Sequence, residues 1–135
     1  MGHWGVKSFE NDDASDALEA GFDRVHGTAY DELMDDRCPL SYDQVHQKFA
    51  DPASLTAALE ALSEVVDRPY EEWDEVERLA FAGVVVRHAE FGVPIPDDAR
   101  LRALDWLEHE AIEWEEATAR RLRKEKEMTL LRKLA

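Results

Sequence analysis

The stretch LAFAGVVV, residues Leu79 to Val86, is the longest apolar run in this chain of 135 residues. Trp73 before it and Phe91 after it continue the pattern at helical spacing, and Gly92 ends it. A helix that is apolar nearly all round is packed on several sides in a globular protein. The three valines would also suit a strand, but the helical flanks and the absence of a partner strand favour a helix. We therefore predict a buried central helix over about residues 70–91.

Amphipathic patterns on both sides of this run predict further helices. A stripe that includes Leu18 and Phe22 predicts a first helix that Gly27 ends. A last helix without an internal breaker would be roughly 55 Å long, whereas a body of this size is about 35 to 40 Å across, so its end is expected to overhang. The sequence thus predicts an all-α bundle of about five helices. The other predicted starts are Ser41 with Gln44, Asp51 with Pro52, and Asp98, from which the last helix runs to about Leu134.

Charge divides the chain into two parts. The formal net charge is −15, from 31 acidic and 16 basic residues. Residues 120–135 hold seven basic and two acidic residues, a net charge of +5, which leaves −20 on residues 1–119. We predict an acidic helical domain over 1–119, with a plug at its N-terminus, and a basic extension of the last helix over 120–135.

Composition also restricts the class of function. Strong acidity opposes binding to nucleic acid and to an anionic membrane. No apolar run approaches the roughly 20 residues that span a bilayer. The chain has no secretory signal pattern, and its single cysteine, Cys38, cannot form an internal disulfide. We therefore expect a cytoplasmic protein whose partner is another protein, including a second copy of itself, with no cofactor.

The N-terminal stretch GHWGVKSFENDDASDAL, residues 2–18, reads as a hydrophobic plug tied to a helix start. Trp4 and Phe9 are expected to close the core, and Asn11 or Asp12 to cap the first helix through a side-chain oxygen. The carboxylates that follow are expected to lie mostly on a solvated helix face.

This stretch resembles the start of the bacterial family catalogued as domain of unknown function 4259. Members begin with a Trp-Gly pair, then a Phe, then Asn-Asp-x-Ala-x-Asp. The resemblance covers about the first 20 residues. It implies a bacterial protein of unassigned function and brings no catalytic residues. The matching residues are Trp4, Gly5, Phe9, Asn11, Asp12, Ala14 and Asp16.

Arg87 is the charged residue that lies on the apolar stripe of the predicted central helix. A buried guanidinium requires a carboxylate, because an unpaired buried charge costs several kcal/mol. We predict that Asp13 or Asp16 supplies it. The alternative is that Arg87 lines a cleft and binds an anionic ligand.

Other candidate sites lack a complete set of functional residues in the sequence. His26 and His46 each follow an aspartate by three residues, a spacing used in helical di-metal sites, but neither has a complete ligand set, so no metal site is predicted. The sequence contains no phosphate-binding loop, zinc-protease motif or cysteine pair. Candidates for contact with a partner are Trp106 and, in the basic tail, Arg120, Arg121, Arg123, Lys124, Leu130, Leu131 and Leu134.

These observations favour a non-enzymatic interaction or regulatory protein. One alternative is an acidic inhibitor or immunity-type protein that masks a basic surface. Another is a helical bundle that binds a metal or a small ligand.

Overall fold

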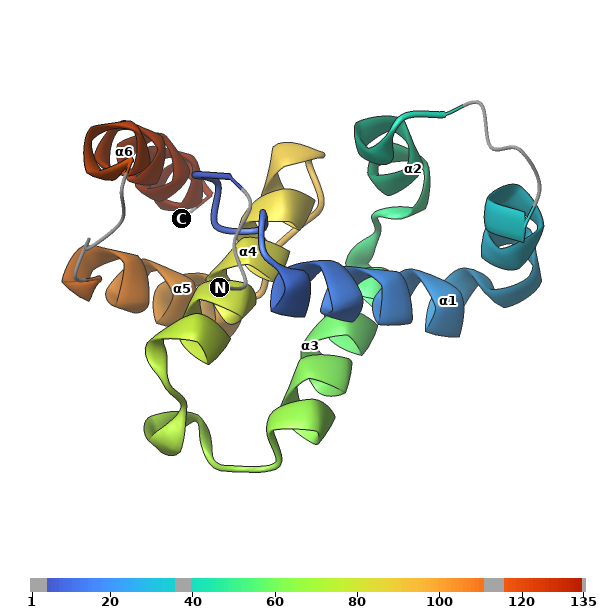
Figure 1. Cartoon of the computed structure of the whole chain (residues 1–135), viewed down its shortest axis with the longest axis horizontal. Helices are drawn as coiled ribbons and strands as arrows, with labels where there is room; N and C mark the ends of the chain where they lie inside the picture. The colour runs from blue at the N-terminus through green and yellow to red at the C-terminus, as the bar shows by residue number, and fades with distance from the viewer. Residues whose placement is uncertain (1–4, 36–39, 111–115, 135) are drawn as a thin grey trace.

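The structure is a computed structural model that describes residues 5–35, 40–110 and 116–134 (Figure 1). Within these residues it is an all-α bundle of six helices with no strand, one helix more than the sequence predicts. No helix in the described part is long and apolar enough to cross a membrane. The helices are α1 (Asp12–Asp35), α2 (Tyr42–Phe49), α3 (Pro52–Val66), α4 (Glu75–Glu90), α5 (Asp97–His109) and α6 (Ala117–Lys133), with a short 3-10 helix at Tyr70–Glu72.

Helix α4 is the centre of the bundle, as predicted. It contacts α1, α3, α5 and α6, and all of its residues from Leu79 to Ala89 are buried. Its start differs from the sequence expectation, because the chain after Pro69 forms only the 3-10 turn before α4 begins. Asp74 is the N-cap: its carboxylate accepts from the Glu77 N–H at 2.8 Å, and the Glu77 side chain accepts from the Asp74 N–H at 3.0 Å.

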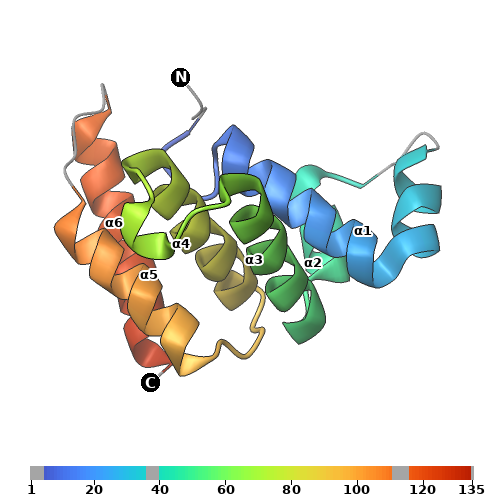
Figure 2. The same ribbon diagram turned by 90° about the horizontal axis from the view of Figure 1, so that it is seen from below.

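Helices α1 and α3 pack closely on one side of α4 (Figure 2). A Cβ at Gly21 would lie 2.7 Å from the Ser54 carbonyl oxygen and 2.8 Å from the Ala58 Cβ, so a glycine permits this approach. At Gly27, α1 bends sharply with φ 42°, which agrees with the predicted end of the first helical segment at this residue.

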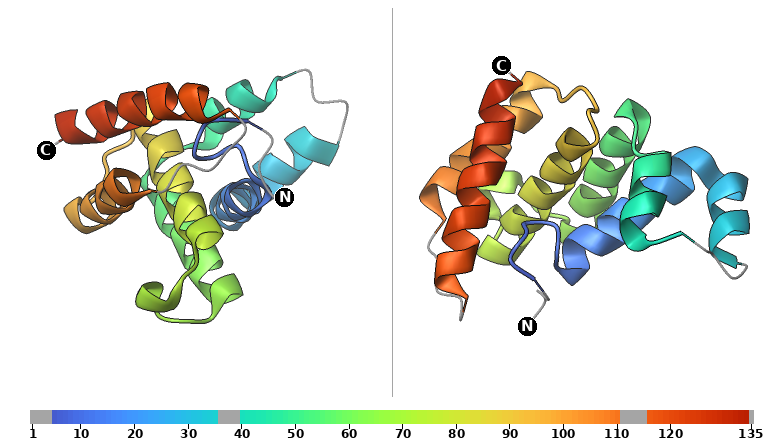
Figure 3. Two further views of the ribbon diagram at one scale, coloured as in Figure 1. Left: turned by 60° about the vertical axis from the view of Figure 1, so that its left-hand side comes forward. Right: turned by 90° about the horizontal axis from the view of Figure 1, so that it is seen from above.

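The predicted single helix from Asp98 to about Leu134 is wrong, because the structure forms two helices, α5 and α6. Glu110, after α5, has extended backbone angles, and α6 packs back against α4 and α5 (Figures 1 and 3). Met128 and Leu131 are buried in this packing. Burial of apolar side chains favours the fold-back over an exposed overhang.

Candidate functional site

The N-terminal loop, residues 5–11, lies between α4, α6 and the start of α1 (Figure 3). Ser8 donates to the Glu127 carboxylate of α6 from its backbone N–H and from its hydroxyl, both at 2.9 Å. The Val6 carbonyl accepts from Arg120 at 2.9 Å. On the α4 side a Cβ at Gly83 would lie 2.4 Å from the Ser8 carbonyl oxygen, so the loop backbone rests directly on the helix. The loop is therefore held on two sides by buried contacts.

Asn11 joins this loop to α1. Its side-chain oxygen accepts from the Ala14 N–H at 2.8 Å, and its side-chain nitrogen donates to the Ser8 carbonyl at 2.7 Å. The first of the two predicted caps is thus confirmed, and Asp12 is the first helical residue. Trp4 lies outside the described residues.

A chain of buried and partly exposed ion pairs extends from the loop across the C-terminal helices. Arg120 pairs with Glu110 at 2.7 Å and with Glu127 at 3.0 Å. Arg123 pairs with Glu127 at 3.1 Å and with Glu90 at 2.7 Å. Since the side chains of Arg120, Glu110 and Glu127 are almost fully buried, each charge needs these partners to offset its desolvation. We call this set, together with Ser8, the clasp.

Arg87 is buried but its partner is not the predicted one. It pairs with Asp43 of α2, lies 3.5 Å from Glu90, and donates from Nε to His46 Nδ1 at 2.9 Å. Asp13 and Asp16 are instead exposed on α1. The pair with Arg87 lowers the pKa of Asp43. Burial and the Arg87 charge lower the pKa of His46 to about 3, so its imidazole is neutral and Nδ1 can accept the hydrogen bond from Arg87 Nε.

Phe9 closes the core next to these charges, as predicted, and is 2% exposed. Its ring lies 4.4 Å from the Arg87 guanidinium carbon, 5.8 Å from that of Arg123 and 5.6 Å from the Lys7 ammonium. The aromatic face thus supplements the carboxylates that neutralise two of these cations. Because Arg87 is only 5% exposed and already paired, the geometry favours the structural role over an anion site.

The two histidines that the sequence offers as metal ligands, His26 and His46, make hydrogen bonds and ion contacts within the protein. His26 Nε2 lies 2.9 Å from the Phe49 carbonyl oxygen and 3.0 Å from the Asp51 carboxylate. His46 Nδ1 accepts the hydrogen bond from Arg87 Nε at 2.9 Å. Across the described parts of the chain, no group of three or more His, Cys, Asp or Glu side chains converges as metal ligands would.

Several of the side chains predicted to contact a partner are buried or engaged within the protein. Trp106 is 8% exposed and lies in the core, and Leu131 is fully buried. Arg120 and Arg123 belong to the clasp, so these four side chains do not form an exposed surface. The predicted tail surface is therefore reduced to Arg121 and Leu134, which are exposed, and Lys124 and Leu130, which are partly buried.

An acidic groove of about 310 Å³ lies between α1 and α3, close to the junction with α4. Its floor is apolar and its rim carries Asp13, Asp16, Glu64 and Glu77 beside Arg24. Partial burial raises the pKa of Asp13, and the nearby carboxylates, Asp16 first among them, raise it further. The sequence predicts Asp13 or Asp16 as a partner of Arg87 and does not predict a groove. Only the packing of α3 against α1 shows that they border a groove.

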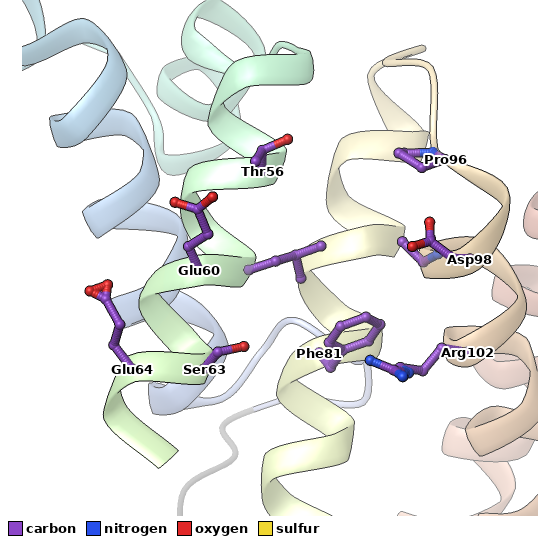
Figure 4. Close-up of a pocket in the computed structure, with 10 residues that line it drawn as sticks. Thr56, Glu60, Ser63, Glu64, Phe81, Pro96, Asp98 and Arg102 are labelled. Atoms are coloured by element: carbon purple, nitrogen blue, oxygen red, sulfur yellow. The ribbon is translucent and has the colours of Figure 1, made fainter. Parts of the chain in front are cut away.

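A second, wider cleft of about 610 Å³ opens between α3 and the α4–α5 pair (Figure 4). Arg102 extends toward Phe81, and its guanidinium carbon lies 4.2 Å from the centre of the Tyr70 ring. Glu60 and Glu64 extend from α3 away from Arg102. A specific ligand site requires polar groups that converge on a common point. The charged groups of this cleft do not.

Comparison of the chain with models of protein families, with curated proteins and with solved structures finds no match. The likeness of the N-terminal stretch to the family of unknown function stays a prediction from sequence.

Proposed function

We propose that this protein is a non-enzymatic interaction module whose acidic body binds a basic segment of a partner protein. The observation that carries the proposal is a difference in ion pairing between two sets of charged side chains. The arginines Arg120 and Arg123 of the basic tail are neutralised inside the clasp, whereas the outward carboxylates of α1 have no ion pair among the described residues. These carboxylates are Asp12, Asp13, Asp16, Glu19 and Asp23.

The acidic face of α1 has the electrostatic properties of a surface for a cationic partner. The pKa of Glu19 is raised by partial burial and by Asp16, and that of Asp13 by burial and four nearby carboxylates. Burial is the largest single cause of both shifts, and repulsion between the charged carboxylates of the folded protein adds to it. A cationic partner relieves this repulsion and is attracted from a distance, so acidity favours both the rate and the specificity of association.

The proposal is tested by affinity capture from a lysate of the source cell with two charge-matched variants. The first carries Asp13→Asn, Asp16→Asn and Glu19→Gln. The control carries Asp105→Asn, Glu116→Gln and Glu125→Gln, three exposed acids of the α5–α6 region that make the same change in net charge.

We expect the wild type and the control to capture the same basic protein and to release it near 0.5 M salt, where exposed charges are screened within about 4 Å. The α1 variant is expected to lose this protein. Equal capture by both variants would contradict the proposal.

An inhibitor or immunity-type protein is a narrower version of the same function. It is favoured by the same acidic face, because masking a basic active site requires contiguous carboxylates. The two are separated by assaying the captured partner: a loss of its activity on addition of this protein supports the inhibitor, and unchanged activity supports a simple interaction module.

A further inference from the structure

We propose that the groove between α1 and α3 receives one arginine or lysine side chain of the basic partner, with the methylene stem on the groove floor and the cationic head at Asp13 and Asp16. This inference rests on the proposed function and names the site through which it acts.

The floor of the groove suits a narrow aliphatic chain. Alanines at positions 17 and 20 of α1 and 61 of α3 leave room that larger side chains would fill. Val65 borders the groove and is 83% exposed, although it is apolar. A stem of methylene groups would cover this surface and remove it from water. The apolar lining consists of Ala17, Ala20, Ala61, Leu62, Val65 and Val66.

The rim supplies two carboxylates that the protein itself leaves without a counter-ion. Glu64 is occupied by Arg24, whose two terminal nitrogens lie 3.0 and 3.3 Å from its oxygens. Glu77 is occupied by Arg68.

Among the described residues no cation pairs with Asp13 or Asp16, which stand three residues apart on one face of α1. The complementary ligand is therefore a cation at the rim with an apolar portion behind it.

The groove is large enough to hold one long side chain. Sites for small ligands range from about 300 to 1,000 Å³, and a groove of about 310 Å³ lies at the lower end. Arginine and lysine carry three or four methylene groups below a charged head and bury the former while the latter stays near water. Both have the form that the groove requires, whereas an anionic or aromatic side chain would meet the acidic rim without a counter-charge.

The first test uses butylguanidinium as a model of the arginine side chain and guanidinium as the control that lacks the stem. Backbone amide shifts of the protein are followed by NMR with each salt at 20 mM and constant ionic strength. We expect butylguanidinium to shift the amides of Ala17, Ala20, Ala61 and Val65, and guanidinium to shift them at least threefold less. Asp13→Asn with Asp16→Asn should abolish the difference. Equal shifts with the two salts, or shifts spread over all acidic surfaces, would overturn the inference.

The second test separates this inference from the proposed function. Ala20→Phe fills the groove and keeps every carboxylate, and its melting temperature checks the fold. Val65→Phe, at an exposed position, replaces it if the first variant does not fold. We expect at least tenfold weaker capture of the basic partner by the filled variant. Undiminished capture, together with loss in the Asp13, Asp16 and Glu19 variant, would overturn the groove and retain the acidic face. Undiminished capture in both would overturn both.

Discussion

Glu127 of α6 accepts two hydrogen bonds from Ser8, at 2.9 Å each, across 119 positions of sequence. The same carboxylate also neutralises Arg120 at 3.0 Å and Arg123 at 3.1 Å. The N-terminal loop is therefore held by the C-terminal helix, and the basic tail is held by the loop. These contacts add to the burial of Met128 and Leu131 in holding the tail on the body.

Glu127→Gln should destabilise the protein by about 3 kcal/mol. It leaves the buried guanidinium of Arg120 and the partly buried one of Arg123 with fewer counter-charges, and it places an amide donor among donors. The free energy of unfolding in urea measures the loss. Glu125→Gln, an exposed change two positions away, is the control and should stay within about 0.5 kcal/mol of the wild type. An equal effect of the two changes would show that the clasp does not contribute to stability.

Gly83→Ala should displace the N-terminal loop from α4. The added Cβ would lie 2.4 Å from the Ser8 carbonyl oxygen, and the backbone on which it presses cannot move without disturbing Glu127. We expect a loss of about 1 to 3 kcal/mol. Amide hydrogen exchange at Ser8 should also become faster, because the hydrogen bond from its N–H to the Glu127 carboxylate lengthens. Unchanged exchange at Ser8 would contradict the close contact.

Arg87→Met should cost less than Glu127→Gln, about 1 to 2 kcal/mol. The partner carboxylate of Asp43 is 71% exposed and stays in water when the guanidinium is removed, whereas the methionine keeps much of the packing against Phe9. Arg87→Ala is the comparison and should cost more, since it leaves a cavity. Equal losses for the two variants would contradict this account.

The same Arg87→Met variant should raise the pKa of His46 from about 3, because the Arg87 charge contributes to lowering it. The pKa should stay below the usual value near 6.5, since burial is the larger cause. NMR titration of the imidazole measures the change. A His46 pKa that does not move would show that Arg87 does not act on it.

Stability should fall as the pH falls from 6.5 toward 5. His46 titrates near 3 in the folded protein, and burial lowers the pKa of His88 as well, whereas both titrate near 6.5 in the unfolded chain. The unfolded chain therefore binds more protons in this range. Each histidine contributes up to about 1.4 kcal/mol per pH unit. Urea unfolding at pH 7, 6 and 5 measures the slope.

His109→Gln, which removes an exposed imidazole, is the control for the loss of a histidine. His46→Gln should reduce the slope even if it lowers the stability at pH 7. A slope near zero in the wild type would mean that the two buried imidazoles protonate in the folded protein.

The helices could be predicted from the sequence because their signals are local. The Ser41–Gln44 and Asp51–Pro52 starts are confirmed, as are the Asn11 cap and the interruption of the first helix at Gly27, where the sequence predicts its end. Each depends on residues within one turn of one another, where a side-chain oxygen or a missing Cβ acts on the nearest backbone. The central position of α4 followed from its composition, because a helix that is apolar all round has to be covered on all sides.

The site could not be predicted, because its contacts join distant segments. By itself the sequence determined which segments are helical, which helix is central and where negative charge accumulates. Only the tertiary structure decided that α6 packs against α4 and α5, that Arg87 meets Asp43, and that α3 makes a groove beside Asp13. The physical reason is that buried charges and apolar faces pair with the groups that packing brings near them. Those groups are distant in the sequence, so the spacing of neighbouring residues does not identify them.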